Sequence, residues 1–419
     1  MNEPNPIELA ACVGLDWADQ RHVICLQASG STPTESCQLE QKPDALHEWI
    51  AQLRVRFPGG KVGIAIEQSR GAVIHALMMY DFLVLYPINP KALARYREAF
   101  RVSGAKDDPL DAQLLLDFLR LHQSRLRAWS PDTVETRQLQ LLCEYRRKLI
   151  NSRIRHTNRI TSWLKMYFPQ ALDWTGELDT IQSCDFLEKW PTLACLQRVR
   201  PTQLRKFYQQ HHCRNLALIE ERLTQIRTAR ALTEDSAIVA ALSFAVQVEA
   251  AQLRPIIGGI ARFDQTIAQQ FAAHPEHELF ESFPGAGAVY APRLLIALGT
   301  DRHRWDSAAD LQCHSGTAPV TKKSGKSCLV HRRLACPNFV RQTFHEFAAQ
   351  SIRYSTWARA YYDQMRRRGL HHPAATRALA FKWIRIIFRC WSDQKPYDEQ
   401  VHLESLRAKQ SSLVKEDSE

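Results

Sequence analysis

The sequence has no apolar run near its C-terminus that is long enough to cross a lipid bilayer. Its most apolar stretch near the C-terminus, residues 378–391, is interrupted by Lys382, Arg385 and Arg389, whereas a membrane helix needs about 20 mostly apolar residues. The first residues also lack the basic stretch, apolar core and cleavage site of a secretory signal. We therefore expect a cytoplasmic protein with no membrane partner.

The sequence also lacks CxxC pairs. Its 11 cysteines are odd in number and scattered, which is typical of reduced thiols in a reducing compartment. One spacing, Cys328, His331 and Cys336, resembles part of a zinc site. Structural zinc takes four ligands, and no fourth is evident, so we do not expect zinc.

The sequence has fewer acidic residues than basic ones. The 419 residues include 55 Lys and Arg against 44 Asp and Glu, a formal net charge of +11. This balance favours a polyanionic partner such as DNA or RNA, although charge alone does not distinguish nucleic acid from an anionic membrane. The length and the 45% hydrophobic content predict two or three domains.

The first 128 residues read as one α/β domain. Two short apolar strands, 12–18 and 22–28, are followed by a weak strand at 37–39 and an amphipathic helix at 43–57. The elements expected next are a strand at 61–67, a helix at 72–80, a strand at 82–88, and helices from Pro90 and Pro109. This order, β-β-β-α-β-α-β-α, is similar to that of the ribonuclease H and RuvC-like nuclease fold.

Residues 129–276 show long helical patterns that predict packed or coiled helices. A solvated charged face on an ordinary helical domain explains this pattern by itself, but the excess of one sign of charge favours a phosphate-facing surface. The residues we single out are Arg146, Arg147 and Arg153. We expect a mostly helical domain at 277–395 and a polar, disordered tail at 396–419.

Two segments of the C-terminal domain suit contact with phosphate. The stretch at 283–299, FPGAGAVYAPRLLIALG, resembles a helix-hairpin turn, in which glycines let a phosphate approach the free amides of the next helix. The segment at 318–333 is basic and rich in turn residues, and its candidate nucleic-acid contacts are Lys322, Lys323 and Lys326.

Four acidic residues have the spacing of a two-metal nuclease. Asp16 lies in the first strand, Glu67 ends the strand at 61–67, and Asp108 and Asp111 open a helix. Mg²⁺ prefers oxygen ligands, and a pair of ions can activate a nucleophile and stabilise the leaving oxygen. Alternation places Asp16 opposite the apolar Leu15, where a buried charge needs a partner or an ion.

The pair Asp108 and Asp111 has a second interpretation. Pro109 suits the first position of a helix, so Asp108 can act as its N-cap, and Asp111 three residues later completes a capping pair. The two roles are compatible, since this spacing places both carboxylates on one helix face. Asp107 is the reserve ligand.

These segments together resemble the insertion-sequence-110 transposases, a family of bridge-RNA-guided recombinases in bacteria. The resemblance extends over nearly the whole chain, and its most specific part runs from IEQSRG to DDPLDA, residues 66–112. It implies that Asp16, Glu67, Asp108 and Asp111 form the DEDD quartet of a RuvC-like domain, holding Mg²⁺ or Mn²⁺. It further implies a coiled-coil dimerisation region and a C-terminal transposase domain with a nucleophilic serine.

The same resemblance implies the partners. They are target and donor DNA, a structured noncoding RNA that pairs with both, and further copies of the chain in a dimer or tetramer at the nucleoid. Phosphate contacts position nucleic acid without specifying its sequence, and Lys106 is a further candidate for such a contact.

The nucleophile that best matches the family's serine-glycine motif is Ser324, in TKKSGKS. A serine hydroxyl needs activation by a base or a metal, and serines are common in turns rich in Gly and Lys. Ser327, Ser315 and Ser307 remain competitors. Ala286 in the PGxG turn and the SGKS stretch depart from the family's commoner patterns.

Two other functions use the same residues differently. A RuvC-like nuclease or junction resolvase needs the four acids but no serine, because water attacks the phosphodiester. In a noncatalytic scaffold that binds nucleic acid, the acids act only as helix caps and ion-pair partners.

Overall fold

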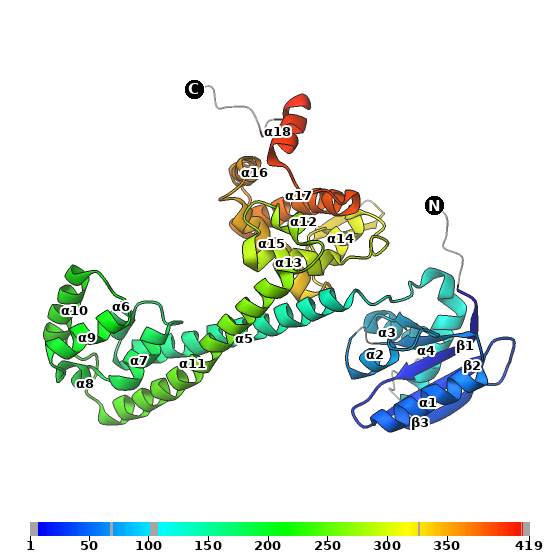
Figure 1. The fold of residues 1–419 in the computed structure, drawn as a ribbon, viewed down its shortest axis with the longest axis horizontal. Helices are drawn as coiled ribbons and strands as arrows, with labels where there is room; N and C mark the ends of the chain where they lie inside the picture. The colour runs from blue at the N-terminus through cyan, green and yellow to red at the C-terminus, as the bar shows by residue number, and fades with distance from the viewer. Residues whose placement is uncertain (1–6, 68–69, 101–107, 326, 412, 414–419) are drawn as a thin grey trace. The chain divides into compact units, whose positions relative to one another are not determined.

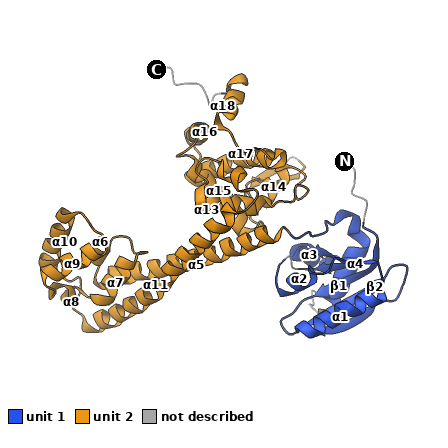
Figure 2. Cartoon of the chain, in the orientation of Figure 1, with its two compact units in different colours: residues 1–131 blue, residues 132–419 orange. Residues whose placement is uncertain are grey.

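The computed structural model describes residues 7–67, 70–100, 108–325, 327–411 and 413. The chain divides into two compact units, Met1–Pro131 and Asp132–Glu419 (Figure 2). The predicted boundary at residue 128 lies close to this division.

The first unit is built on a five-stranded sheet with the order β3-β2-β1-β4-β5. β1 (Leu9–Asp16) pairs antiparallel with β2 (Arg21–Ala28), which pairs antiparallel with β3 (Glu35–Glu40). β4 (Lys61–Ile66) runs parallel to β1, and β5 (Leu83–Pro87) runs parallel to β4. These strands agree with the strands expected from the sequence.

Helices pack on both faces of the sheet. α1 (Pro43–Arg56) buries Leu46, Trp49, Ile50 and Leu53, the face that its spacing predicts, and it shares a core with α2 (Ala72–Leu77). α3 (Pro90–Phe100) and α4 (Asp108–His122) pack with a second core, and the short η1 (Gln123–Arg125) follows. β1 is buried along most of its length because it lies between these two cores.

The second unit is organised around two long helices, α5 (Val134–Tyr167) and α11 (Ser236–Ala272). They run antiparallel, since Arg146 pairs with Asp264 whereas His156, further along α5, pairs with Glu249, earlier in α11. Figure 1 shows the two helices side by side. Long packed helices are therefore present as expected, and a supercoiled dimerisation region stays a prediction.

α11 is the one described helix that is long and apolar enough to cross a membrane. It also carries charged residues that form ion pairs with neighbouring helices, among them Glu249, Arg254 and Asp264. Length and composition alone are weak grounds for a membrane span, because the core helix of a helical bundle meets the same criteria.

Each end of the helix pair carries a separate core. At one end, five short helices pack on α5 and α11: α6 (Ala171–Thr175), α7 (Ile181–Lys189), α8 (Leu193–Gln197), α9 (Pro201–Gln210) and α10 (Leu216–Thr228). The residues that we assigned to one region, 129–276, thus contribute to two cores, because Leu139 and Cys143 of α5 pack with the C-terminal helices.

The C-terminal core lies at the other end of the pair. Its helices are α12 (His277–Glu281), α13 (Gly287–Leu298), α14 (Ala308–His314), α15 (Asn338–Ser351), α16 (Thr356–Arg367) and α17 (His372–Asp393). α17 places Trp383 and Trp391 in the core. Between α14 and α15, β6 (Val320–Ser324) and β7 (Ser327–His331) form an exposed hairpin that we did not predict.

The tail is more ordered than we expected. Tyr397 is buried against Phe283 and Trp383, and α18 (Glu399–Ala408) follows it. Asp398 caps this helix, and Ser355 donates a hydrogen bond to Glu399 at 2.8 Å. The prediction of a disordered tail is therefore wrong for residues 397–408, where an aromatic anchor and a capped helix outweigh the polar composition.

Candidate active site

Asp16 and Glu67 lie side by side at one edge of the sheet. The register of the parallel strands pairs Leu15 with Ile66, so the next residues along each strand are the two acids. Leu15 and Ile66 are fully buried in the core under α1. Because side chains alternate along a strand, Asp16 and Glu67 belong to the opposite face, which α4 covers.

Gly14 brings α4 onto this face. A Cβ atom at Gly14 would lie 2.0 Å from the carbonyl oxygen of Ala112, so the helix can approach only because this residue has no side chain. Further from the edge, a Cβ at Gly63 would meet Leu119. α4 therefore runs antiparallel to β1, with its N-terminal end toward the edge that carries Asp16 and Glu67.

Asp111 occupies the first turn of α4 and is 1% exposed. Arg97 of α3 forms an ion pair with it at 2.5 Å, which compensates a buried charge that would otherwise be costly. Sequence reasoning missed Arg97, because nothing in LARYREAF marks which of its two arginines meets which acid. Asp111 therefore already has a cationic partner within the protein.

Asp108 begins α4, but its side chain lies outside the described residues, as do Lys106 and Asp107. Among the described residues, no three Asp, Glu, His or Cys side chains lie close enough together to hold a metal ion. Asp16 and Glu67 follow neighbouring strand residues on the face that α4 covers, and Asp111 lies in the first turn of α4, but the three do not form a closed ligand set. Paired carboxylates at a strand edge are the donors that a hard cation such as Mg²⁺ prefers.

Comparison with known proteins matches both halves of this architecture. A family model for DEDD transposases of the IS110 group, described as a transposase, covers residues 13–169, and the model for the transposases of the IS116/IS110/IS902 family covers residues 277–363. The chain belongs to the IS110 family of transposases. The first match begins within β1 and includes Asp16, Glu67, Asp108 and Asp111.

Bacterial relatives support this assignment along most of the chain. The mini-circle putative transposase for IS117 of Streptomyces coelicolor is 26% identical over 94% of this chain and 96% of its own length. An IS900 protein of Mycobacterium paratuberculosis is 26% identical over 84% of this chain and 88% of its own. As a member of this transposase family, the protein has DNA as its substrate.

The candidate serines fall into two groups in the structure of this transposase. Ser315 is fully buried and hydrogen-bonded to Gln312 and Thr317, and Ser307 caps α14. Ser324 and Ser327 are exposed and face each other across the tip of the β6–β7 hairpin. Gly325 follows Ser324 with φ +55°, a conformation that favours glycine. Of these four serines, Ser324 and Ser327 are the exposed ones, and Ser307 is partly buried.

The basic residues singled out on α5 have partners within the protein. Arg146 pairs with Asp264, Arg147 with Glu346 at 3.1 Å, and Arg153 with Asp179 at 2.9 Å. Each side chain is no more than 30% exposed. These ion pairs join α5 to neighbouring helices, so the positive run serves packing as well, and contact with phosphate stays a prediction for these three. Lys322 and Lys323 of the hairpin are exposed, and Lys326 lies outside the described residues.

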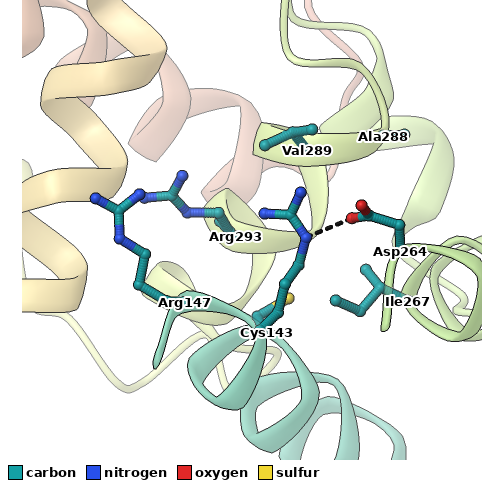
Figure 3. A pocket seen from close by; sticks show the side chains of 8 residues that line it. Cys143, Arg147, Asp264, Ile267, Ala288, Val289 and Arg293 are labelled. Carbon is teal, nitrogen blue, oxygen red and sulfur yellow. Dashed lines mark hydrogen bonds and ion pairs between the residues drawn. The ribbon is translucent and has the colours of Figure 1, made fainter. Parts of the chain in front are cut away.

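The glycine turn at 283–287 leads into α13, whose N-terminus has no side-chain cap. Gly285 and Gly287 both have positive φ. The first turn of α13 lines a small pocket together with Arg146, Arg147 and Arg293 (Figure 3). Its cavity volume is about 10 Å³, room for roughly one water-sized atom, so a phosphate can reach this turn only from outside.

The partial zinc spacing does not form a site. Cys328 and His331 lie three residues apart on β7, which places them on opposite faces of the strand. Cys336 lies against Gly316 instead, and Arg341 donates to its sulfur at 3.8 Å.

Proposed function

We propose that this transposase cuts and rejoins DNA strands with its carboxylate edge and an exposed serine. One observation carries the proposal: Asp16 and Glu67 are neighbours on the face of the sheet toward which α4 directs its acidic N-terminal end. The strand order 3-2-1-4-5 with three antiparallel and then parallel strands supports a fold like that of RuvC and ribonuclease H.

Asp16, Glu67, Asp108 and Asp111 would hold Mg²⁺, or Mn²⁺ in its place. Bound there, the metal would stabilise negative charge on the transferring phosphate and the leaving oxygen. Asp111 would have to share its carboxylate with Arg97 or release it. The guanidinium of Arg97 repels a cation and already neutralises the carboxylate of Asp111. Asp16 and Glu67, which are more exposed, would therefore supply most of the ligands.

The chemistry assigned to Ser324 is a transfer in two steps. Its Oγ loses a proton to a nearby base and attacks phosphorus; the bond from phosphorus to one deoxyribose oxygen breaks, and that oxygen takes up a proton. The product is a phosphoserine ester. Rejoining is the reverse, in which a hydroxyl of another DNA end attacks the ester and releases the serine.

Guidance by a structured noncoding RNA that pairs with target and donor DNA, and assembly as a dimer or tetramer, complete the proposal. Both rest on the resemblance to the family. The basic balance of the chain supports binding of polyanions.

The experiment incubates the full chain with its element's DNA and RNA and looks for protein linked to DNA on a denaturing gel. The wild type should give an adduct that Ser324→Ala abolishes, while Ser307→Ala, at a capping residue, retains it. An adduct that survives Ser324→Ala but not Ser327→Ala moves the nucleophile across the hairpin. Cleavage without any adduct would instead support a water-dependent resolvase, and no cleavage with retained binding would support a scaffold.

A further inference from the structure

A groove of about 450 Å³ lies in the second unit where α13, α15, α16 and α17 meet. Its volume is in the range of ligand-binding sites. The lining residues used below are Tyr290, Glu346, Arg353, Arg359, Tyr362 and His372. None of them belongs to the carboxylate edge or to the serine hairpin.

The groove carries positive charge. Glu346 is the acidic residue among its described lining residues, and it already pairs with Arg293 at 2.7 Å and Arg147 at 3.1 Å. Arg353 and Arg359 are exposed, and the structure shows no ion pair for either with a described residue. Two guanidinium groups are thus available to an anion.

Aromatic side chains stand beside these arginines. Tyr362 is half-buried against the C-terminal core, and its hydroxyl lies 2.8 Å from Nδ1 of His372. Tyr290 is also partly buried against that core. Rings fixed by packing lose little freedom when a flat ligand stacks on them.

The start of α17 adds to the preference for anions. His372 is its first residue, the helix has 22 residues, and no side chain caps its N-terminus. The partial positive charge at a helix N-terminus favours phosphate, and here it adjoins a groove that already holds two arginines.

We propose that this groove binds a segment of single-stranded nucleic acid, with backbone phosphates at Arg353 and Arg359 and a base stacked on Tyr362. Aromatic rings interleaved with arginines are how proteins hold unpaired strands, because the bases of a duplex are stacked on each other and not free to stack on a side chain. The inference rests on the proposed function, which requires strands to separate, and DNA and RNA share the chemistry recognised.

The test measures the binding of the full chain to labelled single-stranded DNA, single-stranded RNA and duplex DNA of equal length by fluorescence anisotropy. Arg353→Gln with Arg359→Gln should weaken binding to single strands about tenfold or more and should reduce the slope of log affinity against log salt by about 1.4, since each phosphate contact on a single strand contributes roughly 0.7. Tyr362→Ala should weaken it about tenfold, whereas Tyr362→Phe, which keeps the ring, should stay within about twofold.

The matched control is Arg198→Gln with Arg227→Gln, which removes the same charge from exposed positions among the short helices. A loss confined to DNA or to RNA identifies the strand that occupies the groove. Equal losses in the groove and control variants, or a loss for duplex alone, would overturn the inference. Loss of DNA cleavage in Asp16→Asn tests the carboxylate proposal separately, because anisotropy measures binding and not cleavage.

Discussion

Gly14 sets how closely α4 approaches the sheet. The two atoms nearest to a Cβ built there are backbone atoms, the oxygen of Ala112 at 2.0 Å and the nitrogen of Leu116 at 2.5 Å. Neither can move without shifting the helix. The absence of a side chain two residues before Asp16 thus lets the N-terminal half of α4 pack directly on the strand that ends at this acid.

We therefore expect Gly14→Ala to lower the free energy of unfolding by about 3 kcal/mol, at the upper end of the cost of overpacking a core. Urea denaturation followed by circular dichroism measures this. Gly258→Ala is the control, because a Cβ at this helical glycine meets no atom within 4 Å and alanine is favoured in helices. If the two variants are equally stable, α4 is not held where we describe it.

The ion pair between Arg97 and Asp111 could not be predicted from the sequence. An acid three residues after a possible N-cap is compatible with a cap, a metal ligand or a buried ion pair. Only the packing of α3 on α4 reveals that a guanidinium is within reach. The four candidate acids could be named from the sequence, whereas the cation already beside one of them could not.

At the scale of elements, the strands of the first unit were predictable because apolar residues dominate them and turn residues bound them. The β6–β7 hairpin gave no such signal. Its residues are exposed on both faces, apart from the partly buried Val320, so there is no alternation of apolar and polar residues to detect. Likewise, the basic run on α5 did not reveal its partners, since Asp264 lies 118 residues beyond Arg146.

α15 contains a group that should make this unit sensitive to acid. Burial, followed by the positive charges of Arg332, Arg377 and Arg341, lowers the pKa of His345 to about 4. An unfolded histidine titrates near 6.5, so between pH 6.5 and 4 the unfolded chain binds a proton that the folded chain excludes. The stability contributed by neutral His345 is present above pH 6.5 and is lost as the pH falls toward 4.

Thermal melts at pH 7.5 and pH 5.5 therefore should show a larger fall in melting temperature for the wild type than for His345→Gln, which cannot take up a proton. His303→Gln, at an exposed histidine in the same unit, should behave as the wild type does. A fall of the same size in all three proteins would mean that His345 does not resist protonation.

At the scale of the whole molecule, the order of the elements, the long helices and the family could be predicted from the sequence. The division of the helices between two cores could not be predicted, because one end of α5 packs in the C-terminal core and the other end packs with the short helices. A boundary read along the chain cannot describe helices that belong to two cores. The groove was not predictable either, because its lining comes from four helices and the residues just after α15, spread over residues 290–372.

The central claim is that acids from β1, β4 and α4 together bind divalent cations. Calorimetric titration of the metal-free protein with Mn²⁺ tests this claim without depending on DNA, RNA or the serine. We expect saturable binding in the wild type and in Glu48→Gln, an exposed acid on α1, and at least tenfold weaker binding in the folded double variant Asp16→Asn with Glu67→Gln. Binding of equal strength in all three proteins would contradict the account.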